Sequence, residues 1–148
     1  MSCERTDSGD PPADAELRPH EVELRMVAGM ARISTVRAVA ADVAMREDFD
    51  LDAVSDLRLA VDEACTTVLT TAKPDGMLVC RLMIARDGVE ISASAETLDG
   101  RPPPKDTLGW HMLQVLVDSV ECWTTTDQQG ERTMHVRITK DVKGSTAP

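Results

Sequence analysis

One long stretch of helical periodicity limits the architectures open to this chain. Apolar side chains recur at three- and four-residue steps from about residue 52 to residue 72, which is typical of an amphipathic helix with one packing face. Lys73, Pro74, Asp75 and Gly76 follow and predict its end. At about 1.5 Å per residue the helix would span roughly 30 Å, about the width of a small domain. The 148 residues are therefore expected to form one domain around this helix.

The remaining segments predict a sheet that packs against this helix. Helical periodicity recurs in residues 29–48 and 110–120. Segments that read as strands are residues 20–26, the two arms of 77–96, 120–127 and 131–140. Asp87 and Gly88 lie between the arms of 77–96 and predict a tight hairpin with a positive φ. This order predicts an α+β fold, a two-layer sandwich of a mainly antiparallel sheet with helices on one face.

The ends of the chain differ in composition from the predicted domain. Residues 1–19 are rich in Asp, Pro, Ser and Gly and contain few large apolar groups, so we expect a disordered acidic tail. We expect the domain itself over residues 20–141 and a flexible tail over 142–148. No stretch resembles a secretory signal or a membrane-spanning helix, and a cytoplasmic protein is expected.

The charge balance argues against several classes of partner. The formal net charge is −10, which repels nucleic acid backbones and anionic lipid. Between Glu47 and Glu63 the chain carries seven acids and one arginine. Such a run is either a solvated face or a docking surface for a basic protein, in which Asp48 and Asp52 would take part.

The cysteines give little support for a metal site. Cys3, Cys65, Cys80 and Cys122 form no CxxC pair and have no histidine at ligand spacing, so no metal is expected. Except for Cys3 in the tail, they are interpreted as small buried apolar side chains, with a disulfide or redox switch as the alternative.

Two acids stand in the middle of the long helix. Asp62 and Glu63 are followed by threonines, and Glu63, Thr67 and Thr71 share one helix line. The acids either form a solvated edge of the packing face or line a polar site. A glutamate one turn from a polar oxygen can hold a magnesium ion and orient a nucleophile.

These residues also carry a resemblance to a known family. The segment "LRLAVDEACTTVLTTA" resembles the N-box helix of the gyrase and histidine-kinase ATPase superfamily, which has the Bergerat fold, in the version of the RsbW/SpoIIAB-type anti-sigma factor kinases. The segment "TLGWHMLQVLVDSVECW" is similar to the glycine-containing segment and following helix of that family, ending in Asp118 and Val120. The closing strand "GERTMHVRITK" supplies Thr133 and Lys140. The likeness covers about residues 20–140 and is nearest to the mycobacterial anti-sigma-F factors.

Several positions depart from the family pattern. Thr67 replaces the asparagine that would bind magnesium, and its hydroxyl is a shorter ligand. The strand "GVEISASAE" ends without the Asp-x-Gly-x-Gly that would read adenine, and Trp110 follows Gly109 where a flexible lid would wrap phosphates. The resemblance therefore implies that Glu63 is a vestigial general base, and that Thr67, Gly109 and Thr133 form a weak or lost site for Mg-ATP.

The resemblance implies an anti-sigma factor that sequesters an alternative sigma factor of the sigma-F or sigma-B type. Arg37 in "ISTVRAV" matches the arginine that contacts sigma factor in the family, and Arg32, Asp48 and Asp52 are the other expected partner contacts. An anti-anti-sigma factor would release the sigma factor, and a homodimer is expected by resemblance. The alternatives are an active ATP-dependent serine kinase that phosphorylates an anti-anti-sigma factor, and an interaction module unrelated to transcription.

Overall fold

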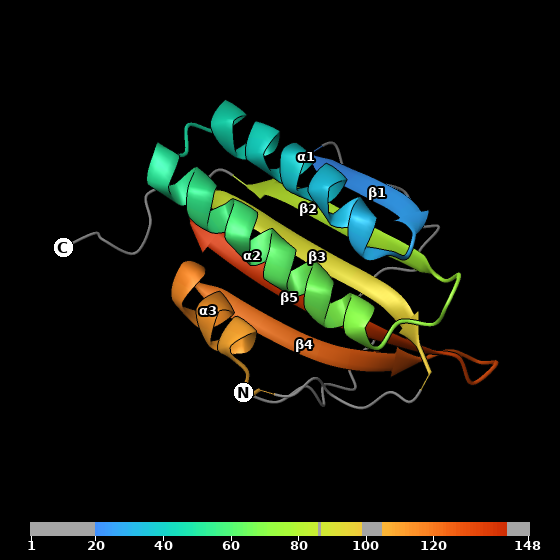
Figure 1. The fold of residues 1–148 in the computed structure, drawn as a ribbon. Coiled ribbons are helices and arrows are strands. Elements are labelled where there is room, and N and C mark those ends of the chain that lie inside the picture. The colour runs from blue at the N-terminus through green and yellow to red at the C-terminus, as the bar shows by residue number, and fades with distance from the viewer. Residues whose placement is uncertain (1–19, 86, 99–104, 142–148) are drawn as a thin grey trace.

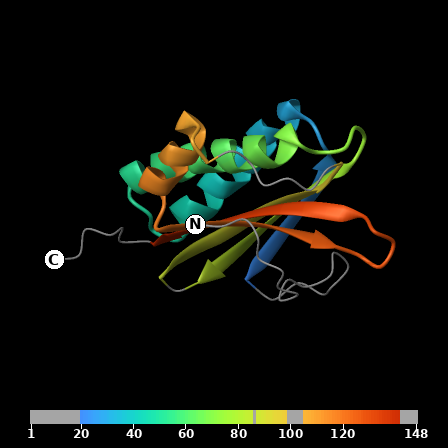
Figure 2. The same cartoon turned by 90° about the horizontal axis from the view of Figure 1, so that it is seen from below.

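The protein forms a five-stranded antiparallel sheet with helices on one face. The computed structural model describes residues 20–85, 87–98 and 105–141. The strands are β1 (Glu21–Val27), β2 (Met77–Ala85), β3 (Gly88–Thr97), β4 (Ser119–Thr126) and β5 (Arg132–Asp141), in the spatial order β1-β2-β3-β5-β4. The helices are the 3₁₀ turn η1 (Met30–Arg32), α1 (Ile33–Arg46), α2 (Leu51–Thr70) and α3 (Leu108–Leu116). Figures 1 and 2 show the two layers, which confirm the predicted α+β sandwich.

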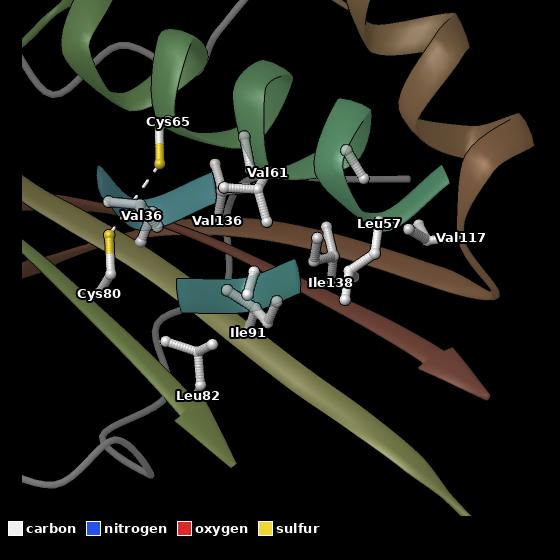
Figure 3. Packing of buried hydrophobic residues seen from close by; sticks show 14 of the residues in the cluster. Val36, Leu57, Val61, Cys65, Cys80, Leu82, Ile91, Val117, Val136 and Ile138 are labelled. Carbon is white, nitrogen blue, oxygen red and sulfur yellow. Dashed lines mark hydrogen bonds between the residues drawn. The ribbon is translucent and has the colours of Figure 1, made fainter. Parts of the chain in front are cut away.

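The core lies between α2 and the sheet. Strand alternation turns Ile91, Val136 and Ile138 toward the helices, where Leu57 and Val61 of α2 pack on them (Figure 3). All five side chains are at most 2% exposed. Burying an aliphatic side chain of this size contributes about 1.5–3 kcal/mol, so this contact holds α2 in a fixed position over the sheet.

The long helix has the extent that its periodicity predicts. Asp50 caps its first turn by accepting a hydrogen bond from the backbone N–H of Ala53 at 2.8 Å. At the other end, Lys73 donates its backbone N–H to the carbonyl of Glu96 at 2.8 Å, and Ala72 forms a bridge with Thr97. The chain therefore leaves the helix directly onto the end of β3.

The other two helices differ from prediction at their ends. The segment expected to be one helix over 29–48 is split into η1 and α1, and Asp48 has a φ of 63° in the turn before α2. The helix expected over 110–120 begins earlier because the Thr107 hydroxyl accepts from the Trp110 N–H. It ends at Leu116 because Asp118 already donates to the carbonyl of Thr139 in β5, which draws the chain into the sheet.

The hairpin between β2 and β3 is confirmed, but its glycine has another role than expected. Gly88 is the first residue of β3 and does not have a positive φ. A Cβ at this position would lie 2.5 Å from the carbonyl oxygen of Lys140 in β5, so glycine is needed for close strand approach. Arg86 lies outside the described residues. In the β4–β5 hairpin, Gly130 has a φ of 84°, as turn chemistry requires.

The tails predicted at residues 1–19 and 142–148, which include Cys3, lie outside the described residues. Within the described part of the chain, no helix combines the length and the apolar character needed to cross a bilayer.

Candidate functional site

The two acids of the long helix face different neighbours. α2 contacts α1 on one side and α3 on the other (Figure 1). Consecutive residues of a helix point about 100° apart, so Asp62 faces α1 while Glu63 faces α3. The two acids therefore lie on different sides of α2 and do not form one acidic site.

On the α1 side, Asp62 pairs with Arg37. Arg37 donates from Nη1 to Asp62 Oδ2 at 2.9 Å, and the two side chains are 37% and 28% exposed. The other carboxylate oxygen, Oδ1, is buried and has no hydrogen-bond partner within the part of the chain that the structure describes. Asp62 is therefore a half-buried residue at the edge of α2, and the packing of α1 against α2 gives it a specific partner.

A surface pocket of about 380 Å³ lies beside this ion pair. It is formed between η1, the first turns of α1, and α2. Its lining combines apolar and polar residues and consists of Met30, Ala31, Ile33, Ser34, Arg37, Asp62 and Thr66. The sequence pattern gave no signal for this pocket, because its two walls are residues about 30 positions apart.

On the α3 side, Glu63 is pressed against Gly109. A Cβ built at Gly109 would overlap with Glu63 Oε2 and lie 3.1 Å from Cδ. The packing of α3 on α2 thus brings these two predicted site residues into direct contact with each other. Thr67 joins them only through its hydroxyl, which donates to the backbone carbonyl of Glu63 at 2.8 Å, a bond internal to the helix.

Two further hydroxyls are buried near the end of α2. The Oγ1 atoms of Thr71 and Thr97 are buried without a hydrogen-bond partner among the described residues. Thr97 is 2% exposed and ends β3, where it bridges Ala72. Sequence reasoning missed Thr97, although the inward phase of β3 alternation would have pointed to it.

Thr133 does not join this group. β5 alternates so that Met134 is fully buried on the helix side, while Thr133 pairs with Thr125 and Glu96 on the opposite face of the sheet. The assignment of Thr133 to a site with Thr67 and Gly109 is therefore contradicted, because a strand turns successive side chains to opposite faces.

The four expected partner residues lie at two ends of the helix pair. Arg32 is an exposed residue of η1, close in sequence to Arg37. Asp48 lies in the turn after α1, and exposed Asp52 lies in the first turn of α2. Eleven residues separate Arg37 from Asp48, which places the two groups about 15 Å apart along the helices. They form two patches and not one cluster.

The two motif residues near the end of the sheet have structural partners. Lys140 donates from Nζ to the carbonyl of Leu116 at 2.8 Å and lies 3.5 Å from a carboxylate oxygen of Asp56. Asp118 accepts the backbone N–H of Asp141 at 2.7 Å. These contacts tie α2, α3 and β5 together.

The oxygen donors beside Glu63 are its own carboxylate and the hydroxyl of Thr67 one turn further along α2. Mg²⁺ requires oxygen ligands in near-octahedral geometry. The Thr67 hydroxyl donates to the backbone carbonyl of Glu63, and a Cβ at Gly109 would meet the Glu63 carboxylate. Among residues 20–85, 87–98 and 105–141, no group of three or more His, Cys, Asp or Glu side chains could hold a metal ion.

Comparisons with known proteins agree with this architecture. The family model described as the histidine kinase-like ATPase domain matches residues 26–140. The chain is 38% identical over 102 residues to "Anti-sigma-F factor RsbW" of Mycobacterium tuberculosis, a match covering 68% of this chain and 60% of the relative. It is 27% identical over 129 residues to "Serine-protein kinase RsbW" of Bacillus cereus, covering 70% and 78%. The match thus spans less than two thirds of the mycobacterial relative.

A solved structure shares the fold. The crystal structure of the RsbU and RsbW domains of a Mycobacterium tuberculosis protein superposes with a TM-score of 0.55 at 16% identity. The superposition covers 81% of this chain and 33% of that one. At this identity the likeness concerns the fold alone.

Proposed function

The chain belongs to the histidine kinase-like ATPase domain family, and on this premise we propose that it is an anti-sigma factor that sequesters an alternative sigma factor of the sigma-F or sigma-B type. An anti-anti-sigma factor that competes for the same surface would release the sigma factor. The name of the mycobacterial relative supports this function. The observation that carries it is the difference between the two sides of α2. The side facing α1 has a surface pocket beside a partly exposed arginine, whereas on the side facing α3 the Glu63 carboxylate lies against Gly109.

The α1 side of α2 is suited to protein contact. Arg37 presents a partly exposed guanidinium to a pocket that is lined in part by apolar side chains. Its Nη1 binds Asp62, while an arginine has five N–H donors in total. Arginine beside an apolar pocket is typical of residues that contribute strongly to protein interfaces.

The α3 side is proposed to hold Mg-ATP weakly or not at all. Gly109, which would offer its backbone to phosphate, is covered by the Glu63 carboxylate. A carboxylate at that place repels a phosphate group, so binding would require Glu63 to move away first. In this proposal Glu63 is a residue of α2 that packs against α3. Competition between partner proteins, without phosphorylation, then controls the release of the sigma factor.

A charge swap tests the sigma contact. We expect Arg37→Glu to weaken binding of a purified sigma factor of this type about fivefold or more, since a central interface arginine typically contributes about 1 kcal/mol or more. Arg37→Asp combined with Asp62→Arg restores an internal ion pair but not the partner contact, and should stay weak. The matched control is Arg46→Glu, because Arg46 lies on the same helix and, within the described part of the chain, forms an exposed ion pair with Asp42.

Titration calorimetry of all four proteins gives the answer. Equal affinities for wild type and the Arg37 variants would place the sigma contact elsewhere, and no binding to any sigma factor would favour an interaction module unrelated to transcription.

Added nucleotide tests the second part of the proposal. We expect millimolar Mg-ATP to leave the melting temperature unchanged and to transfer no phosphate to an anti-anti-sigma factor. Ligand at 100 times its Kd would stabilise the fold by about 2.7 kcal/mol, which is easily seen. A clear rise in melting temperature together with phosphate transfer would establish the serine kinase instead.

A further inference from the structure

The Arg37–Asp62 pair leaves both a donor and an acceptor unused. Arg37 engages Asp62 through Nη1 alone, and among the described residues no side-chain partner is found for its Nε and Nη2. Asp62 engages Arg37 through Oδ2 alone, and its Oδ1 is buried without a partner in the described part of the chain. A buried acceptor without a partner costs about 1–3 kcal/mol, so a group that donates to Oδ1 would recover part of that cost.

The pair also limits the charge of a group that can bind there. Its own charges cancel, so a carboxylate attracted by Arg37 is repelled by Asp62, and a cation attracted by Asp62 is repelled by Arg37. A neutral group that accepts from one and donates to the other meets both needs. The primary carboxamide of an Asn or Gln side chain carries one acceptor and two donors on a single planar group.

The pocket beside the pair has room for such a side chain. Its volume is about 380 Å³, and Met30 and Ile33 supply an apolar wall for the methylene groups. Met30 is 55% exposed, so part of this wall is open to solvent and can be covered by a partner.

We propose that the pocket between η1, α1 and α2 binds an Asn or Gln side chain of the partner protein, with Asp62 as the residue that selects a carboxamide over a carboxylate. Arg37 donates to the carboxamide oxygen, and Asp62 Oδ1 accepts from its nitrogen after a small rotation that opens it to the pocket. One part of the inference rests on the proposed function, namely that the carboxamide belongs to a partner protein that docks on α1.

Small isosteric probes test this without any partner protein. We expect butyramide to shift the NMR signals of the Arg37 Nε–H and of backbone amides in residues 30–37 and 62–66 of the full-length chain. Butyrate and butylammonium, tested under the same conditions, should bind several-fold more weakly. Asp62→Ala should raise the Kd for butyramide about tenfold, as loss of a hydrogen bond to a charged group does. Asp42→Ala, which breaks the exposed ion pair between Asp42 and Arg46 on α1, should leave the Kd for butyramide unchanged.

Three results would overturn the inference: butyrate binding as well as butyramide, unchanged butyramide binding in a folded Asp62→Ala variant, or no response to any probe. If sigma factor still binds through Arg37 in these cases, only the carboxamide preference has failed. If butyramide binds as expected but no sigma factor does, the proposed function fails and the pocket remains. Melting temperatures of both variants check that they fold.

Discussion

Replacing Gly109 with alanine tests whether Glu63 closes the α3 side of the long helix. Gly109 is the second residue of α3, and a Cβ there would overlap with Glu63 Oε2. Two effects then oppose each other. Alanine stabilises a helix relative to glycine by up to about 0.5–1 kcal/mol. Displacing Glu63 from its position costs about 0.5–1.5 kcal/mol if its side chain must leave a preferred rotamer.

The single substitution is therefore expected to change the free energy of unfolding little. In the Glu63→Ala background the overlap is absent, so Gly109→Ala should stabilise the protein by about 0.5–1 kcal/mol. The difference between the two backgrounds is a coupling energy of about 1 kcal/mol between Glu63 and Gly109.

Urea unfolding of wild type, both single variants and the double variant measures this coupling. Sites that do not touch are additive within about 0.3–0.5 kcal/mol. An additive result would mean that Glu63 does not rest on α3, and the proposal of a closed nucleotide site would lose its basis. A matched control is Gly130→Ala. A Cβ at Gly130 would meet no neighbouring heavy atom within 4 Å, but the backbone φ is 84°. This substitution should destabilise the protein through backbone strain alone and show no coupling to Glu63.

Two other predictions concern titratable groups. Burial and then the nearby Asp118 raise the pKa of Asp141 above 3.8. A raised carboxyl pKa contributes stability below the unfolded value, which is lost as pH rises through the folded value, so Asp141→Asn should be more stable than wild type at pH 7 and similar below pH 4. The pKa of the Cys80 thiol is raised by a hydrogen bond with Cys65 and, to a lesser extent, by burial. The Sγ atoms of Cys65 and Cys80 lie 4.0 Å apart. Mass-spectrometric mapping should find both thiols unlabelled by iodoacetamide at pH 8 until the protein unfolds. Rapid labelling of the folded protein would contradict the cysteine prediction. Equal dependence of stability on pH in Asp141→Asn and wild type would contradict the aspartate prediction.

Much of the fold follows from local periodicity. The apolar steps of residues 52–72 predict α2 to within two residues at each end, and alternation predicts β5 over residues 131–140. Helix ends were harder to predict, because they depend on single hydrogen bonds. The Thr107 cap and the bond from Asp118 to Thr139 move α3 away from its expected limits.

Asp62 and Glu63 show how much of the candidate site can be predicted from the sequence alone. The sequence placed Asp62 and Glu63 on a packed helix and, through their neighbours, pointed to a site at Glu63, Thr67 and Gly109. A helix gives each residue its direction relative to its own axis, but not the identity of what lies there. Only the docking of α1 and α3 on either side of α2 decided that Asp62 meets Arg37 and that Glu63 meets Gly109.

The same division holds for Thr133. Its position in the closing strand followed from the sequence, whereas its face followed from the register of β5 against β3 and β4. A shift of one residue in a strand exchanges its two faces, and register is set by pairings between residues far apart in the chain. Local spacing therefore determined the elements of this protein and their order, while long-range packing decided which side chains share a site.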